Sequence, residues 1–119
     1  MKIFRVQDSE GRGPWRPGFS HNWVIDRPDH ANLPPWPFEF GLDKVLDSRK
    51  PNEWMGCGCL SLKQLRRWIT MKEYRTLKKL GYGCVMLEGN AIAVSDIQCV
   101  FTRDRPLFED IKKLKLYRI

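Results

Sequence analysis

Apolar and polar positions follow three different patterns along the 119-residue chain, and the first is a short alternation. Residues 3–7 alternate in character, which predicts a strand with Ile3 and Arg5 on one face. Phe4 and Val6 lie on its other face. Arg5 therefore places a charge inside an otherwise apolar pattern, and a charge at such a position needs a partner or a ligand.

The second pattern is irregular and covers residues 8–56, which hold seven of the eight prolines and many other turn formers. A segment so rich in proline cannot be mostly helix or sheet. Its aromatic residues argue against disorder. They are Trp15, Phe19, Trp23, Trp36, Phe38, Phe40 and Trp54. We expect a long ordered segment with short helical turns near residues 41–47, and such segments in compact domains are usually functional.

Helical spacing marks the third pattern, from residue 61 onward. Ser61 and Gln64 fit a capping box, in which the serine caps a helix and the glutamine reaches back. The apolar residues that follow are Leu62, Leu65, Trp68 and Ile69. Thr70 and Glu73 fit a second capping box, and the apolar stripe after it ends at Gly81, a typical C-terminal stop.

Short runs of strand-forming residues flank these helices. They predict strands at 55–60, 82–87, 91–94 and 97–102, with a turn at 89–90. Beyond Pro106, helical spacing returns over residues 107–116, with apolar residues at Phe108, Ile111, Leu114 and Leu116. Because helices and strands are segregated along the chain, the sequence predicts a single α+β domain over residues 1–119.

The net charge of +7 is concentrated in one short stretch. Residues 57–80 hold seven basic side chains against the single acid Glu73, a balance of +6, whereas residues 1–56 balance at zero. A localised basic face meets nucleic acid, anionic lipid or an acidic protein surface, or it is a solvated helix face. The stretch 63–79 is therefore the candidate for contact with nucleic acid.

The cysteine spacing and the start of the chain bear on metal binding and location. A single glycine separates Cys57 from Cys59, and both histidines lie far upstream, which is not typical of a zinc site. We expect no metal and four free thiols that pack as small apolar residues. Because no secretion signal and no apolar run of membrane-spanning length occur, we expect a cytoplasmic protein without membrane contact.

Three short motifs carry a resemblance to a known family. They are Phe4-Arg5-Val6, Gly58-Cys59-Leu60-Ser61 before a helix, and residues 80–85 followed by 98–101. Together they resemble the ADP-ribosyltransferase superfamily. Residues 8–14 and 61–68 are also similar to a family of small phage and bacterial proteins. Residues 80–88 are similar to an anti-CRISPR protein that ADP-ribosylates its target.

The resemblance implies a fold and a chemistry. Two small antiparallel sheets grip NAD between them, and the bond to nicotinamide breaks through an oxocarbenium-like state that a carboxylate stabilises. Arg5 matches the first-strand arginine that holds the dinucleotide phosphates. Ser61 matches a serine at the junction of a strand and a helix. The candidates for the carboxylate position are Glu88, Asp96 and, as a neutral amide, Gln98.

Each of these residues also has a structural interpretation. Arg5 can be an ion-paired arginine on an edge strand, and Ser61 can be a helix cap alone. The two acids can be solvated turn residues. Asp96 and Gln98 would face the same side of a strand. If Gln98 holds the catalytic position, its neutral amide cannot offset a full positive charge, and transfer is lost.

A second group of candidates does not depend on the family. Arg12 and Arg16 flank Gly13-Pro14-Trp15, and this combination suits a nucleotide. Arginine binds phosphate, glycine allows close approach and tryptophan stacks on a flat ring. The alternative is a proline-rich turn with Trp15 packed on the core. His21 is a weaker candidate, because a lone histidine near a tryptophan is more often structural.

Three functions follow as hypotheses. The first is an ADP-ribosyltransferase, encoded by a phage or mobile element, that uses NAD and modifies a host protein. The second is an inactive inhibitor on the same scaffold that binds a host protein through its basic helices. The third, a basic module that binds nucleic acid, ranks lower because no nucleic-acid-binding motif is visible.

Overall fold

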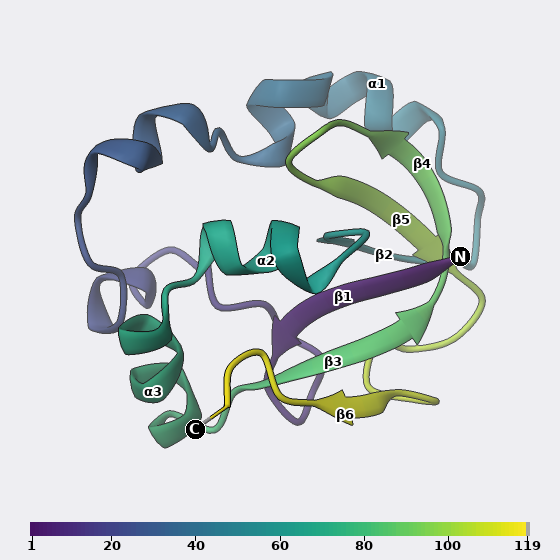
Figure 1. Ribbon diagram of the computed structural model, residues 1–119. Helices are drawn as coiled ribbons and strands as arrows, with labels where there is room; N and C mark the ends of the chain where they lie inside the picture. The colour runs from purple at the N-terminus through teal and green to yellow at the C-terminus, as the bar shows by residue number, and fades with distance from the viewer. Residues whose placement is uncertain (119) are drawn as a thin grey trace.

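Two small antiparallel sheets and three α-helices make up the fold in the computed structural model, which describes residues 1–118 (Figure 1). The first sheet has the order β1–β3–β6, with β1 (Lys2–Gln7), β3 (Gly83–Glu88) and β6 (Lys112–Leu114). The second has the order β2–β5–β4, with β2 (Trp54–Gly58), β5 (Cys99–Arg103) and β4 (Asn90–Val94). The helices are α1 (Leu42–Asp47), α2 (Leu62–Trp68) and α3 (Met71–Lys79). The predicted α+β class with two antiparallel sheets is confirmed.

The two sheets are joined by one backbone pair, between Phe4 on β1 and Cys59 just after β2. The N–H of each residue donates to the carbonyl oxygen of the other at 2.8 Å. β1 is an edge strand of its sheet, and this pair is isolated, so the ladder does not continue beyond it. Neighbouring residues of β1 and β2 therefore have backbone edges that are not paired with each other.

Apolar side chains form two clusters, one on each side of β1. Val6 belongs to the cluster between the first sheet and the helices, which also contains Leu65, Tyr74, Leu77 and Cys84. Ile3 belongs to the cluster between the two sheets, with Leu87, Cys99 and Phe101. The alternation predicted for residues 3–7 is thus confirmed, and it directs Arg5 to the side between the sheets.

The proline-rich segment, residues 8–56, is ordered, as expected. It contains single turns at Ser20–Asn22, Pro28–Asn32 and Pro37–Gly41, and the last runs into α1. The fully buried Glu73 of α3 holds this segment by accepting a 2.9 Å hydrogen bond from the N–H of Ile25. Figure 1 shows the segment passing outside α3 and then above α2 before it reaches the second sheet.

Both predicted helix caps are present. The Ser61 hydroxyl accepts a hydrogen bond from the N–H of Gln64 at 3.1 Å, and Thr70 and Glu73 form a full reciprocal capping box. The Gln64 side chain reaches back, but its Oε1 accepts from the N–H of Leu60 rather than from that of Ser61. The glutamine therefore ties the end of the strand region to the helix that follows.

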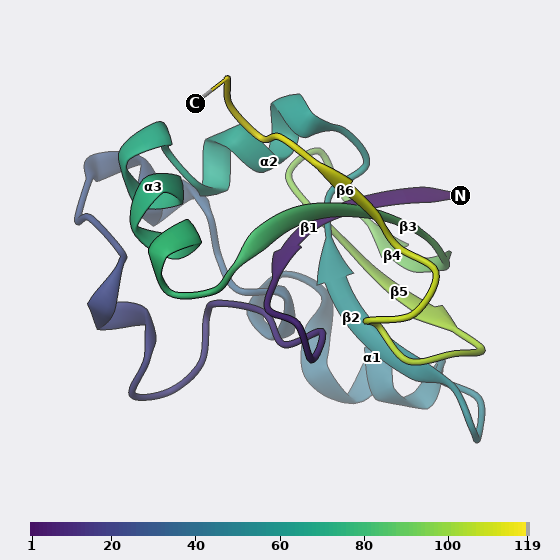
Figure 2. The ribbon, with the colours of Figure 1, turned by 90° about the horizontal axis from the view of Figure 1, so that it is seen from below.

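The predicted helix over residues 107–116 is wrong. Lys112–Leu114 form β6, which pairs antiparallel with β3 (Figure 2). Asp110 has a positive φ of 49°, which interrupts a helical path just before the strand. Ile111 packs on the cluster between the two sheets, whereas Leu116 belongs to the cluster between the first sheet and the helices. The apolar residues thus serve two separate cores, which one helix face cannot do.

The helices of residues 1–118 are short. None of them has both the length and the apolar character that crossing a membrane requires.

Candidate functional site

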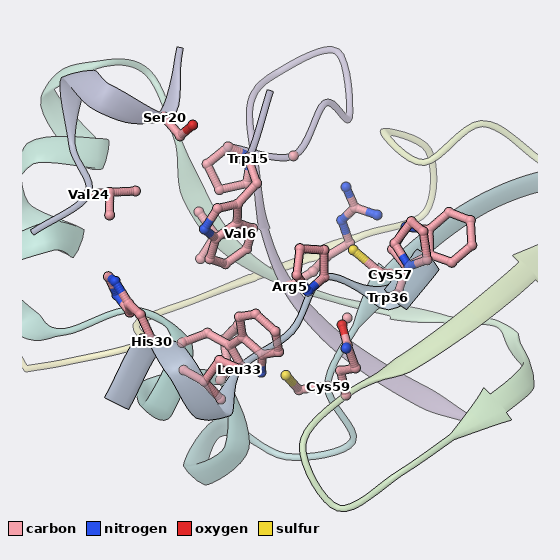
Figure 3. A pocket seen from close by; sticks show the side chains of 18 of the residues that line it. Arg5, Val6, Trp15, Ser20, Val24, His30, Leu33, Trp36, Cys57 and Cys59 are labelled. Carbon is pink, nitrogen blue, oxygen red and sulfur yellow. The ribbon is translucent and has the colours of Figure 1, made fainter. Parts of the chain in front are cut away.

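A pocket of about 740 Å³ lies beside the Phe4–Cys59 pair and is the candidate functional site. Arg5 and Val6 of β1, residues 57–59 and Gln98 line it on the side of the sheets, and Leu65 and Trp68 of α2 and turns of the proline-rich segment line the rest. Figure 3 shows Trp15, Trp36, His30 and Leu33 among the side chains around it. The volume lies within the range of about 300–1,000 Å³ typical of small-molecule sites.

Arg5 supplies a buried positive charge to this pocket. It is 6% exposed, and Nη2 donates one long hydrogen bond, 3.3 Å, to the carbonyl oxygen of Gly11. Within residues 1–118, Nε and Nη1 are buried and have no hydrogen-bond partner. Burial lowers the pKa of Arg5, although an arginine stays protonated in proteins. A buried cation without a carboxylate is costly, so this guanidinium is suited to bind an anion.

Two glycines and an aromatic ring hold the Arg5 guanidinium in place. A Cβ on Gly56 would collide with Nη1, and a Cβ on Gly13 would lie 3.3 Å from Nη2. The ring of Phe101 lies 5.9 Å from Cζ, which is within cation–π range. The group is therefore fixed by packing rather than by ion pairing, and within residues 1–118 its Nε and Nη1 donors are buried without a partner.

Of the three candidates for the carboxylate position, Gln98 alone lines the pocket. It is 5% exposed, and its Nε2 donates to the carbonyl oxygen of Pro34 at 2.8 Å and to Oε1 of Glu39 at 2.9 Å. Arg5 and Gln98 thus line the same pocket.

The two acidic candidates lie elsewhere. Glu88 ends β3 and pairs with the N-terminal amine of Met1 at 3.0 Å, and its side chain is 66% exposed. Asp96 is exposed and belongs to a turn that the N–H of Ser95 closes by donating to the carbonyl oxygen of Gln98. Because β5 begins only at Cys99, Asp96 and Gln98 do not share a strand face, and that expectation is wrong.

The remaining arginine and serine candidates have partners outside the pocket. Arg12 pairs with Asp8 at 2.8 Å and Glu10 at 2.9 Å in an exposed turn. Arg16 donates to the hydroxyl of Tyr82 at 2.7 Å. Ser61 caps α2 and is not among the residues that line the pocket. The structure therefore brings neither Arg12, Arg16 nor Ser61 together with Arg5.

Trp15 lines the pocket, as does the weaker candidate His21. The ring of Trp15 makes edge-on contacts with Trp23 at 5.2 Å and Trp68 at 5.6 Å, measured between ring centroids. It is nevertheless 44% exposed, so a face of the ring remains available. Both interpretations of Trp15, packing on neighbours and lining a site, therefore hold.

Several lining residues were not singled out from the sequence. They are Asp26, His30, Trp36 and Trp68, and Glu39 lies behind Gln98. Asp26 is the one acid among the described residues that line the pocket. The aromatic content of the proline-rich segment indicated an ordered, functional segment. Because an irregular segment has no periodicity, its sequence does not predict which of its side chains point toward the pocket.

The four cysteines are free thiols. Cys57 and Cys59 line the pocket, and burial raises the pKa of both. Cys57 lies close enough to Arg5 for the cation to oppose this rise. Both thiols are therefore protonated at neutral pH and contribute neutral walls to the site.

The basic stretch of α2 and α3 is only partly free. Arg66 donates to the carbonyl oxygen of Leu116 at 2.9 Å, and Arg67 makes two 3.1 Å hydrogen bonds to Asp29. Tyr117 donates to the carbonyl oxygen of Ile69 at 2.6 Å, which lays the C-terminal residues beside these helices. The five other basic residues of the stretch are exposed: Lys63, Lys72, Arg75, Lys78 and Lys79.

The fold and the pocket define a class: a small α+β protein whose two joined sheets border a ligand-sized pocket with a buried arginine that has no ion-pair partner among the described residues. The chain belongs to the Bacteriophage T4 Y00F protein family, whose model matches residues 1–115. It is thus a member of a phage protein family. No curated protein and no solved structure matches it.

Proposed function

We propose that this chain binds NAD in the pocket and transfers ADP-ribose to a protein of the phage's host, in the host cytoplasm. The observation that carries the proposal is the Arg5 guanidinium, which is buried, has no carboxylate partner within residues 1–118 and lines the pocket. A dinucleotide pyrophosphate supplies the charge that this group lacks, and the planar guanidinium suits phosphate oxygens.

The walls of the pocket fit the rest of such a ligand. Trp15 and Trp36 offer flat apolar surfaces on which adenine or nicotinamide rings stack. The cysteines and prolines around them are uncharged, so the charge of Arg5 acts in a weakly polar surrounding. A flat anionic nucleotide is therefore a better match than a cationic or purely apolar ligand.

The transfer step has a simple balance. The bond between ribose C1′ and the nicotinamide nitrogen breaks, and nicotinamide leaves with the electron pair. A nucleophilic side chain of the host protein then bonds to C1′ and releases its proton. The positive charge that develops on the ribose needs a nearby anion. Asp26 lines the pocket and Glu39 contacts Gln98, so these two acids are the candidates.

A second candidate function is an inhibitor that binds NAD or a host protein without transfer. It is favoured by Gln98, because a neutral amide lies in the pocket where the resemblance puts an acid. Glu88 and Asp96, the two acidic candidates for the carboxylate position, do not line the pocket. The same experiment separates this alternative from the transferase.

The test measures NAD binding, nicotinamide release, and transfer of labelled ADP-ribose from adenylate-labelled NAD to proteins in host-cell lysate. We expect both activities in the wild type, their loss in Arg5→Met, and their retention in Arg12→Ala, which removes an exposed arginine outside the pocket. NAD binding without release or labelling would favour the inhibitor. Absence of NAD binding, or equal effects of the two substitutions, would contradict the proposal.

A further inference from the structure

Gln98 lines the pocket and belongs to a hydrogen-bonded group of three side chains. This group contains a carboxylate, whereas Arg5 supplies the pocket with a cation. Oε1 of Glu39 accepts hydrogen bonds from Nε2 of Gln98 and from Oγ of Ser95, both at 2.9 Å. Glu39 is half-buried and lies in the turn Pro37–Gly41, whereas Ser95 and Gln98 close the turn before β5. Residues far apart in sequence thus meet at one carboxylate oxygen.

This arrangement fixes which way the Gln98 amide points. Its Nε2 faces two acceptors, the carbonyl oxygen of Pro34 at 2.8 Å and the Glu39 carboxylate at 2.9 Å. Reversing the amide would put Gln98 Oε1 against both acceptors and leave no donor between them. Both N–H groups of the amide are therefore used, and its orientation is determined by the protein.

As a consequence, the amide oxygen of Gln98 is an accessible hydrogen-bond acceptor at the pocket. Within residues 1–118, Gln98 Oε1 accepts no hydrogen bond, and it is not among the buried side-chain atoms without a partner. Since Gln98 is 5% exposed and lines the pocket, the accessible surface of Oε1 faces that space. The carboxylate behind the amide strengthens this acceptor, because hydrogen bonds in a chain polarise one another.

We infer that Glu39 is a positioning residue, which fixes Gln98 as a hydrogen-bond acceptor that selects ligands with a neutral O–H or N–H donor. Arg5 then binds an anionic part of the ligand, and Gln98 accepts a hydrogen bond from a neutral O–H or N–H group of the ligand. The inference deepens the proposed function and rests on it for the choice of NAD as probe. The 2′-hydroxyl of the nicotinamide ribose and the nicotinamide carboxamide are the neutral donors of NAD nearest the bond that breaks, and they are the two to test.

The first measurement needs no ligand. Exchange of the Gln98 side-chain N–H protons is followed by NMR in the wild type, Glu39→Ala, Glu39→Gln and the control Asp43→Asn, an exposed acid of α1. We expect at least tenfold faster exchange in Glu39→Ala. Glu39→Gln should retain slow exchange, because its amide oxygen still accepts, and the control should match the wild type. Unchanged exchange in Glu39→Ala would overturn the positioning role.

The second measurement compares NAD with two analogues. One carries an acetyl group in place of the carboxamide and so lacks its N–H donors, and the other lacks the 2′-hydroxyl of the nicotinamide ribose. We expect the wild type to bind NAD at least fivefold more tightly than one of them, which identifies the donor. Glu39→Ala should bring that ratio close to one, and Glu39→Gln should restore most of it.

The outcomes separate the two ideas. An unchanged selectivity ratio in Glu39→Ala, with NAD still bound, would overturn the inference and leave the proposed function standing. Failure of the wild type to bind NAD, with the exchange result as expected, would remove the proposed function and support the Glu39–Gln98 relationship on its own.

Discussion

Phe4 and Cys59 pair through both of their backbone groups, and this is the one pair that joins β1 to β2 in residues 1–118. Arg5 follows Phe4 directly, and Cys57 precedes Cys59 by two residues. The backbone pairing between the two sheets stops at Phe4 and Cys59. The side chains of Arg5 and Cys57 therefore line a pocket beside this pair and do not belong to one continuous sheet. The junction of the sheets therefore determines where the site lies.

The first prediction concerns the stability cost of the Arg5 charge. Arg5→Met keeps an unbranched apolar stem and removes a buried cation whose Nε and Nη1 have no partner within residues 1–118. We expect the free energy of unfolding to stay the same or to rise by about 1–3 kcal/mol, since replacing buried ions by apolar groups is often stabilising. Urea unfolding measures it.

A clear fall in stability of Arg5→Met would mean that the guanidinium is a structural group. The matched comparison is Arg103→Met in β5. Arg103 is 7% exposed and, in the part of the chain that the structure describes, also has buried nitrogens without partners, but it does not line the pocket. We expect both variants to gain stability, because each loses a buried cation. A loss of NAD binding in Arg5→Met alone would then show that Arg5 binds the ligand and that burial of an arginine is not sufficient for binding.

The strands and helices that depend on local periodicity could be predicted from the sequence. The alternation at residues 3–7 and the caps at Ser61 and Thr70 depend on neighbours within a few residues, so they were predictable. The helix expected over 107–116 failed because pairing with β3 and packing on two cores outweighed local spacing.

The site was predictable only in part, for a related reason. Arg5 was recognisable because a charge interrupts an apolar strand, and Gln98 through a family resemblance. Glu39 and Asp26 were missed, since their positions depend on how an irregular segment folds against β5 and the helices. Contacts across more than fifty residues, such as Glu39 to Gln98, leave no spacing signal in one sequence.

The second prediction tests the packing around the guanidinium. Gly56→Ala places a methyl group where the structure has Arg5 Nη1, with Phe101 and Leu107 atoms 3.1 Å away. We expect lower stability and at least tenfold weaker NAD binding, because the guanidinium must move. Gly83→Ala is the matched control, since no atom lies within 4 Å of its Cβ. Equal effects of the two substitutions on NAD binding, measured by calorimetry, would contradict the account.

The third prediction exchanges the two groups of the amide–carboxylate pair. Gln98→Glu alone removes the donor to Glu39 and sets two carboxylates side by side, so we expect a loss of about 2–4 kcal/mol in unfolding free energy. Adding Glu39→Gln should recover most of it, because one donor and one carboxylate are again present. Denaturant unfolding of the single and double variants provides the test. No recovery in the double variant would show that the pair does not interact as described.

The fourth prediction concerns stability at high pH. Burial raises the pKa of Cys84 to about 12 and that of Cys99 to about 11, from an ordinary value of 9.0. The folded state therefore keeps these protons between pH 9 and 11 while the unfolded state releases them. Stability is complete below pH 9 and falls as the pH rises, by up to about 1.4 kcal/mol per thiol for each pH unit.

Thermal unfolding between pH 8 and 11 measures this slope. The control is the double variant Cys84→Ala, Cys99→Ala, in which the decline above pH 9 should be shallower, although the thiols of Cys57 and Cys59, whose pKa burial also raises, and the lysines still contribute there. Identical slopes for the wild type and the double variant would mean that these thiols do not cause the pH dependence.

The most direct test of the central claim is a calorimetric titration of NAD into the wild type and into Arg5→Met, with Arg12→Ala as the control. The account predicts saturable binding to the wild type and to Arg12→Ala, with a site occupancy of one. It predicts affinity at least tenfold weaker for Arg5→Met, since a charge-assisted contact is worth about 1.5–3 kcal/mol. Absence of binding to the folded wild type, or equal affinity for Arg5→Met, would contradict the assignment of the pocket.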